Sequence, residues 1–158
     1  ETIAGQIKEL GGEANLVPIF EASPVDNMDG HIQNTFKDGN ICARTNKASG
    51  SPFMYFRVVD KALRDGDRPI TLTLQYYDEG KAGDVFLVEY DSAFGDGPQD
   101  KYRPLAKFTK TGKKGWSFVV FQLERARFGQ RQNGGADFRI YCGGDADEYV
   151  RDIKLSEQ

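Results

Sequence analysis

The chain contains one histidine, His31, in the segment MDGHIQN. A Ser-His-Asp or Cys-His mechanism would have to use this residue as its base, and no nucleophile elbow accompanies it. Cys42 and Cys142 lie far apart in the chain, which is not the spacing of a metal knuckle. They could form one long-range disulfide or remain two buried thiols. One histidine and two distant cysteines cannot complete a tetrahedral zinc site without carboxylates, so we expect neither a catalytic histidine nor zinc.

Oxygen ligands are more abundant than nitrogen or sulfur ligands. The segments VDNMDG, YDSAFGDG and GGDADE are dense in Asp, Asn and Gly, and such loops can offer carboxylates and carbonyls to calcium. None has the register of an EF-hand, and the same residue types are the ordinary residues of turns. With 24 acidic residues, a pair of carboxylates for glycoside hydrolysis can always be nominated, so such a pair carries no weight alone.

Positive charge is concentrated in residues 101–131. This stretch has nine basic side chains against one acidic side chain, Glu124, and so carries +8 in a chain whose net charge is −3. Clustered charge attracts a partner of opposite sign, so the stretch predicts either a solvated face or a groove for an anionic chain. A pI of ≈ 5.2 and the lack of nucleic-acid-binding motifs argue against nucleic acid. The basic residues are Lys101, Arg103, Lys107, Lys110, Lys113, Lys114, Arg125, Arg127 and Arg131.

Short β-strands are predicted to position these side chains. Segment 70–78, ITLTLQYYD, alternates apolar and polar residues, which is typical of a half-buried strand with Tyr76 in the core. Segment 116–123 begins with the only tryptophan, Trp116, and its β-branched and aromatic residues favour a strand, covered on both faces at its middle. We predict a short helical turn at the start of the chain and a loop over 23–40. Further strands are predicted at 16–22, 41–46, 51–60, 85–92, 102–111 (an edge strand, because of Pro104), 137–142 and 148–156.

Short strands separated by turn signals predict an all-β fold, an antiparallel two-sheet β-sandwich. A length of 158 residues suits a single domain over 1–158. No apolar run approaches the ~20 residues needed to cross a bilayer, so we expect no membrane partner. The chain begins at Glu1 without a signal-peptide pattern, which suits a processed secreted protein or an excised domain.

Segments 70–92, 116–141 and 148–155 resemble a galactose-binding-domain-like β-sandwich, a type of module appended to bacterial polysaccharide-degrading enzymes. The resemblance runs from about Asn40 to Leu155, and the phrases YYDEG, YDS, ARF and ADFRI and the tryptophan that opens a strand carry it. It implies a jelly roll and non-catalytic carbohydrate binding, which holds an attached catalytic domain on a polysaccharide. It also implies a secreted or cell-surface location.

Modules of this type often hold a structural calcium between the first strand and the last. The matching positions are Glu21 in IFEA and Asp152 in RDIKL. The family pattern commonly has a second acid two residues after the first, where this chain has Ser23.

Such modules bind sugars with aromatic rings, because the C–H face of a sugar stacks on a π surface while polar side chains take its hydroxyls. The candidate platforms are Tyr77, Tyr102 and Trp116, and the candidate polar partners are Arg103, Arg131, Asn133 and Asp137. Trp116 could instead pack under an edge loop, and Arg139 is expected in a sheet-face ion pair. The +8 stretch points to an anionic polysaccharide, which arginine would bind bidentately.

Two other functions fit the same sequence. A small β-sandwich polysaccharide lyase would use a Tyr or Lys to abstract the proton α to a uronate, with an Arg neutralising its carboxylate. A protein-binding or adhesion domain would use the sandwich as a scaffold.

Overall fold

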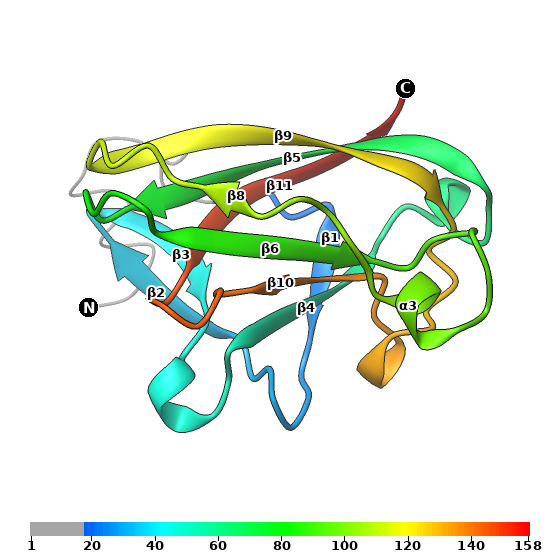
Figure 1. Ribbon diagram of the computed structural model, residues 1–158, viewed down its shortest axis with the longest axis horizontal. Helices are drawn as coiled ribbons and strands as arrows, with labels where there is room; N and C mark the ends of the chain where they lie inside the picture. The colour runs from blue at the N-terminus through cyan, green and yellow to red at the C-terminus, as the bar shows by residue number, and fades with distance from the viewer. Residues whose placement is uncertain (1–17) are drawn as a thin grey trace.

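A computed structural model describes residues 18–158 and shows two antiparallel β-sheets packed face to face (Figure 1). One sheet, the six-stranded sheet, has the order β1 (Ala22–Val25), β4 (Phe53–Val58), β10 (Phe138–Tyr141), β6 (Val85–Tyr90) and β7 (Arg103–Pro104), with β8 (Phe108–Thr109) also pairing with β6. The five-stranded sheet has the order β2 (Gln33–Lys37), β3 (Asn40–Arg44), β11 (Tyr149–Glu157), β5 (Arg68–Asp78) and β9 (Gly115–Ala126). The predicted all-β antiparallel sandwich is therefore confirmed.

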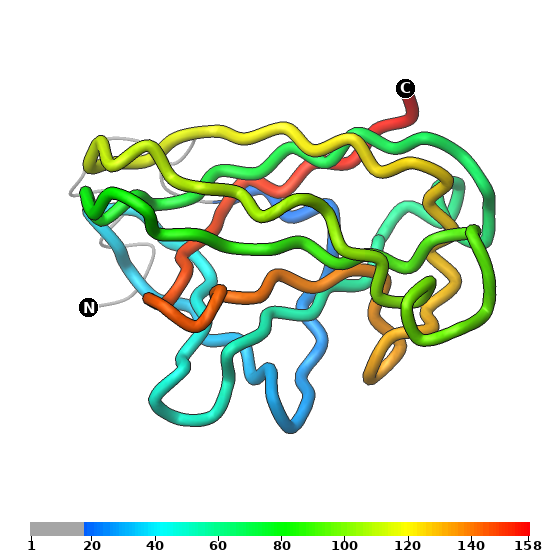
Figure 2. The backbone as a smooth tube through the Cα atoms, viewed as in Figure 1, coloured from blue at the N-terminus to red at the C-terminus, as the bar shows by residue number. Residues whose placement is uncertain are grey.

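Short helical turns connect the strands. They are η1 (Lys47–Ser49), η2 (Lys61–Leu63), α3 (Pro98–Lys101) and η3 (Asn133–Gly135). Among residues 18–158, no helix has the length and apolarity that crossing a membrane requires. The loop over residues 26–31, coloured blue, and the loop around η1 project on the side of the molecule where β4 lies (Figures 1 and 2).

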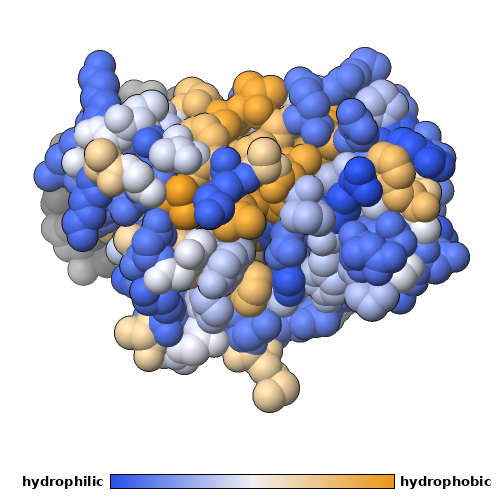
Figure 3. Space-filling model, viewed as in Figure 1, coloured by the Kyte–Doolittle hydropathy of each residue, from blue (hydrophilic) through white to orange (hydrophobic). Residues whose placement is uncertain are grey.

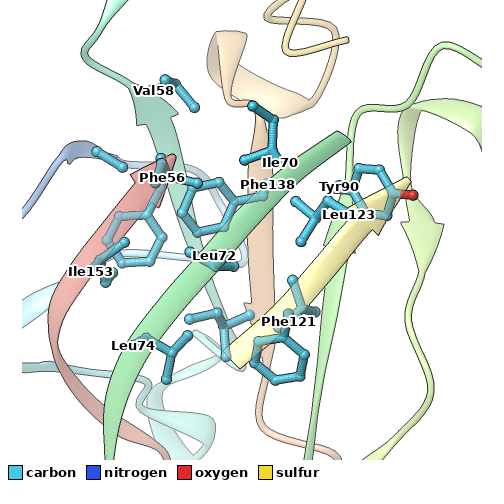
Figure 4. Packing of buried hydrophobic residues seen from close by; sticks show 14 of the residues in the cluster. Phe56, Val58, Ile70, Leu72, Leu74, Tyr90, Phe121, Leu123, Phe138 and Ile153 are labelled. Carbon is cyan, nitrogen blue, oxygen red and sulfur yellow. The ribbon is translucent and has the colours of Figure 1, made fainter. Parts of the chain in front are cut away.

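The core lies between the sheets and follows the alternation of the strands. Ile70, Leu72 and Leu74 of β5 are fully buried, and Tyr76 is 2% exposed, as predicted. Figure 4 shows Ile70, Leu72 and Leu74 facing aromatic rings from the other sheet, among them Phe138 of β10. Burying apolar side chains on the inner face of each sheet supplies the main driving force for this packing.

Two predictions about the strands are wrong. Residues 23–40 were expected to form a loop but contain most of β1 and all of β2, which pair with β4 and β3. Pro24 is tolerated because β1 lies at the edge of its sheet. The middle of β9 is not covered on both faces: it is an edge strand, with Phe118 and Val120 61% and 55% exposed.

Other strand predictions are confirmed with changed bounds. The edge strand expected at 102–111 is present as two short strands, β7 and β8, both paired with β6. In the expected strand 16–22, residues 16 and 17 and the preceding helical turn lie outside the described residues. Phe20 forms a parallel bridge to Ile153 of β11. Cys42 and Cys142 are both buried free thiols.

Candidate functional site

The structure separates the predicted binding residues into three groups. Tyr77 and Trp116 lie on the outer face of the five-stranded sheet, where they are cross-strand partners. Tyr102 and Asn133 meet beside the outer face of the six-stranded sheet. The third group, which lies in ion pairs and loop packing, comprises Arg103, Arg131 and Asp137.

The largest cluster of aromatic and polar side chains lies on the outer face of the six-stranded sheet. Alternation along β4, β10 and β6 sends these side chains away from the core, and the register makes Arg139 the direct neighbour of both Tyr55 and Glu89. Tyr141 is in the same way the neighbour of Phe53. We call this surface the Arg139 face; its members are Phe53, Tyr55, Glu89, Tyr102, Asn133, Arg139 and Tyr141.

Arg139 is the centre of this face. Its guanidinium carbon lies 4.1 Å from the centroid of the Phe53 ring and 4.2 Å from that of Tyr102. Its Nε lies 2.8 Å from Glu89 Oε1, and its Nη1 donates a 2.8 Å hydrogen bond to the Tyr55 hydroxyl. Contact with aromatic rings and a carboxylate fixes both the charge and the plane of the guanidinium. The sheet-face ion pair expected for Arg139 is therefore confirmed.

Tyr102 and Asn133 extend the face towards the loops. The Tyr102 hydroxyl donates to Asn133 Oδ1 over 2.7 Å and accepts from the Asn133 backbone N–H over 2.8 Å. Asn133 Nδ2 donates to the Tyr55 hydroxyl over 3.3 Å. Tyr102 directly follows α3, and Asn133 opens η3, so two short turns bring residues from distant parts of the chain together.

A hollow of ≈ 580 Å³ adjoins Asn133 and is lined also by Asn27, Met28, Asp29 and Gly134. Asp29 Oδ1 is buried, and among the described residues no hydrogen-bond donor satisfies it. Amide and carboxylate side chains in a hollow that adjoins aromatic rings offer hydrogen-bond partners to ligand hydroxyls.

Glycine is required where the loop 26–31 meets the sheet. A Cβ at Gly30 would lie 2.6 Å from Cδ1 of the Tyr55 ring and 2.9 Å from the Phe53 carbonyl oxygen, closer than atoms can pack. The glycine therefore lets the loop lie directly against the Arg139 face.

Electrostatics keeps the groups of the face in fixed protonation states. Burial raises the pKa of the Tyr55 hydroxyl, against the opposing effect of its hydrogen bond with Arg139. Burial works to lower the pKa of Arg139, but its bonds to Glu89 and Tyr55 outweigh burial, and the pKa is raised. Arg139 is thus a permanent cation and Tyr55 a neutral phenol at physiological pH.

The Tyr77 and Trp116 pair offers less open ring surface. Tyr77 is only 3% exposed, and the two rings pack edge to face with centroids 5.3 Å apart. The Trp116 indole N–H donates to the Lys37 carbonyl oxygen over 3.2 Å. The Lys37 ammonium lies 5.2 Å from the Tyr77 centroid and 2.7 Å from Glu79 Oε1. The structure therefore places Tyr77 in a packing role and holds the half-buried Trp116 by its indole N–H.

The remaining predicted polar residues are engaged within the protein. Arg103 lies 3.7 Å from the Phe94 ring centroid. Arg131 pairs with Asp91 and Asp96, each over 2.8 Å. The Asp137 carboxylate is fully buried.

Asp137 accepts hydrogen bonds from the backbone N–H groups of Val58 and Gln130, both over 2.8 Å. A carboxylate that is enclosed and bonded to the backbone of two segments orders those segments and is closed to an external ligand.

Four of the nine basic side chains of the stretch form ion pairs with acids from other parts of the fold. Such pairing lowers the field that the stretch presents to an anionic ligand. The pairs are Lys110 with Glu148, Arg125 with Asp67, Arg127 with Asp96, and Arg131 with Asp91 and Asp96.

At the expected calcium position, the segment that leads into β1 lies beside β11, with Phe20 bridged to Ile153. Asp152 Oδ1 accepts from the Ile19 N–H over 2.8 Å, and Glu21 Oε1 accepts from the Leu155 N–H over 2.9 Å. Within residues 18–158, no group of three or more His, Cys, Asp or Glu side chains could hold a metal ion. Two carboxylates already bonded to backbone amides do not fit calcium, which takes six to eight oxygen ligands.

Sequence reasoning missed Phe53, Tyr55, Glu89 and Tyr141 as members of the face. The pattern that could have found them is alternation, since Phe53 and Tyr55 stand two residues apart in one predicted strand. The registers that bring β4, β10 and β6 together are set by long-range pairing and are not visible in the separate segments.

No family model and no curated protein matches this chain. Among solved structures, the K3 cleaved adhesin domain of Lys-gingipain from Porphyromonas gingivalis is 13% identical, with 75% of this chain and 74% of that chain covered and a TM-score of 0.46. The K1 cleaved adhesin domain of the same protein is 14% identical over 87% and 82%, with a TM-score of 0.42. BiXyn10A CBM1 in its apo form is 9% identical over 88% and 91%, also with a TM-score of 0.42. These likenesses are too distant to identify a family, and the fold rests on the strand pairing described above.

Proposed function

We propose that this domain binds a carbohydrate on the Arg139 face and does not cleave it. The observation that carries the proposal is the Arg139 guanidinium, held over the rings of Phe53 and Tyr102 and by Glu89 and Tyr55. This arrangement is complete without a ligand, so little side-chain order has to be gained on binding.

The chemistry of the face suits a sugar. The rings of Phe53, Tyr102 and Tyr141 are half-buried and present apolar surface on which the C–H face of a pyranose can stack. The side chains of Asn133 and Asp29 line the hollow beside the rings and can bond to hydroxyl groups.

A neutral polysaccharide fits better than the anionic one suggested by the sequence. The charge of Arg139 is balanced by Glu89, and the adjoining hollow contributes the carboxylate of Asp29. Four of the nine basic side chains in 101–131 are paired with acids elsewhere in the fold. The face therefore offers hydrogen-bond partners to hydroxyls and no unpaired cation to a uronate or sulfate.

Binding without cleavage agrees with the state of Tyr55. A tyrosine that abstracts a proton at neutral pH needs a lowered pKa, whereas burial raises the pKa of Tyr55. In this proposal the domain is a module of the galactose-binding-domain-like type. It keeps an attached catalytic domain on a polysaccharide outside the cell.

Affinity gel electrophoresis and calorimetry test the proposal with neutral polysaccharides (xylan, mixed-linkage β-glucan, galactan) and anionic ones (polygalacturonate, a sulfated glycan). We expect retention by a neutral polymer, and Tyr102→Ala should weaken it about tenfold because a stacked ring is lost. Tyr102→Phe, which keeps the ring, should lose less affinity for the polymer than Tyr102→Ala. Phe94→Ala removes a ring that is 37% exposed outside the face and serves as the matched control.

Unchanged affinity in Tyr102→Ala would place any sugar site elsewhere. Absence of retention by every polymer, with no release of unsaturated uronate, would favour the protein-binding alternative.

A further inference from the structure

The free edge of β9 is unusual among the edges of this sandwich. β9 is twelve residues long, and among the strands of residues 18–158 it pairs only with β5, so that its other edge has no strand partner there apart from one bridge at Ala126. From Gly115 to Leu123 it contains no charged residue and no proline. Natural proteins usually protect a long edge with charges, proline or bulges, because unpaired backbone groups bind other strands.

Apolar side chains line the outer face of this edge. Phe118 and Val120 stand two residues apart, so they point the same way, and they are 61% and 55% exposed. Figure 3 shows an apolar area on the surface over β9 and the neighbouring strand of the other sheet. Exposed apolar area next to an open edge is typical of an interaction surface.

The edge is open along most of its length and closed at one end. The Ala93 N–H donates to the Arg125 carbonyl oxygen over 2.7 Å, and Ser92 forms a bridge with Ala126. The part of β9 that can accept another strand therefore ends near Glu124.

Opposite charges stand at the two ends of this open part. Lys114 precedes it and Glu124 closes it, and both side chains are exposed. Neither has an ion-pair partner within residues 18–158. Glu124 and Phe118 have even positions in β9 and point to the same side of it, and Lys114 directly precedes the strand.

We propose that the partner of this edge is a second copy of the same chain, paired antiparallel with β9 about a two-fold axis at Val119. This register sets Phe118 opposite Val120 and Lys114 opposite Glu124, each twice by symmetry. Aromatic–β-branched pairs and opposite charges are the cross-strand pairs that stabilise antiparallel sheets.

The charges of Lys114 and Glu124 favour a second copy of this chain over an unrelated strand as the partner of β9. One register brings both the apolar pair and the charge pair into contact, and an antiparallel self-pairing closes after two copies and leaves no open end of β9. The proposal does not depend on the carbohydrate site, which lies on the other sheet.

Sedimentation velocity over a wide concentration range tests this dimer. Lys114→Glu sets like charges opposite each other and should raise the dimer dissociation constant roughly tenfold. Glu124→Lys should do the same, and the double variant Lys114→Glu/Glu124→Lys should return the dissociation constant to near the wild-type value. Lys154→Glu makes the same charge change at an exposed side chain of β11, away from the β9 edge, and should leave the dimer dissociation constant unchanged.

A monomer at every concentration overturns the proposal. A dimer that is insensitive to Lys114→Glu, or equally sensitive to Lys154→Glu, overturns the register. Circular dichroism spectra that match the wild type show that each variant is folded.

Discussion

Lys110 and Glu148 form the most deeply buried ion pair among the described residues. The ammonium nitrogen lies 2.6 Å from Glu148 Oε1, and both side chains are fully buried. Lys110 follows β8 and Glu148 precedes β11, so the pair joins the two sheets. Burial raises the pKa of Glu148 to about 9, although Lys110 acts to lower it. Because the desolvation of both charges is costly, each of the two residues can stay buried only while the other is present to interact with it.

Lys110→Met is expected to destabilise the fold by about 3–5 kcal/mol, since it leaves a buried carboxyl without its partner. The pKa of Glu148 is already raised from 4.5 to about 9 by burial, and the variant removes the cation that acts to lower it, so the carboxyl must be protonated to stay buried. The stability of the variant should therefore be highest below pH 4.5 and fall as pH rises towards the folded pKa. Urea unfolding at several pH values between 4 and 9, in roughly unit steps, measures this slope.

The double variant Lys110→Met/Glu148→Leu should recover most of the lost stability and lose the added pH slope, because apolar residues replace both charges. Arg125→Met breaks an exposed pair with Asp67, which solvent screens, and should change stability far less than Lys110→Met. Equal losses of unfolding free energy in Lys110→Met and Arg125→Met would contradict the idea that burial makes the Lys110–Glu148 pair the more sensitive one.

For single residues, the sequence indicated which side chains could bind a sugar but not which groups surround each of them in the fold. Tyr102 and Asn133 were predicted as binding residues, and the structure brings them together. Asp137 and Arg131 have equally suitable chemistry, yet each is bonded to groups far away in the chain. Whether a polar side chain faces a ligand or a neighbouring segment depends on tertiary contacts, which residue type and spacing do not specify.

Among the connecting elements, two turns are joined by the buried carboxylate of Asp78. Oδ1 accepts from the Gly80 N–H over 2.8 Å. Oδ2 accepts from the Gly112 N–H over 2.8 Å and from the Thr111 hydroxyl over 3.2 Å. One side chain thus holds the turn after β5 against the turn that precedes β9.

Asp78→Ala should destabilise the domain by about 2–4 kcal/mol, because it removes three part-buried hydrogen bonds to a carboxylate. It should also speed tryptic cleavage at Lys113 and Lys114, which lie in the released turn. Asp60→Ala removes one exposed bond, to the Ala62 N–H, and should cost about 1 kcal/mol. Thermal unfolding and limited proteolysis of both variants measure the difference, and equal losses would contradict a joining role for Asp78.

Strand existence was predictable where alternation is strong. β5 and β10 follow directly from apolar periodicity and turn residues, and their predicted bounds lie close to those observed. β1 and β2 were missed because Pro, Asp and Asn dominate their neighbourhood, and these strands form through pairing with β4 and β3. The exposed face of β9 was missed for two reasons. Apolar residues occur on both faces of this strand in the sequence, which predicted burial on both, and its position at the edge of the sheet depends on the topology.

For the molecule as a whole, the segment that leads into β1 lies beside the last strand, β11, and the described residues form no cluster of metal ligands there. Glu21 and Asp152 bind backbone N–H groups across this junction. We therefore expect EDTA and added calcium to leave the melting temperature unchanged. A clear drop with EDTA that calcium reverses would contradict this and restore the calcium expected from the family resemblance.

Sheet layering has a consequence for attachment. An antiparallel pairing of two β9 edges has its two-fold axis normal to the sheet, so the five-stranded sheets of both copies join edge to edge with the same face upward. Both Arg139 faces then point in one direction. Two weak binding sites that face the same direction can bind one flat polysaccharide surface at the same time. Once the first site is bound, the second site binds at an effective concentration on the order of millimolar. Avidity, which neither site has alone, would follow from the position of one unprotected strand.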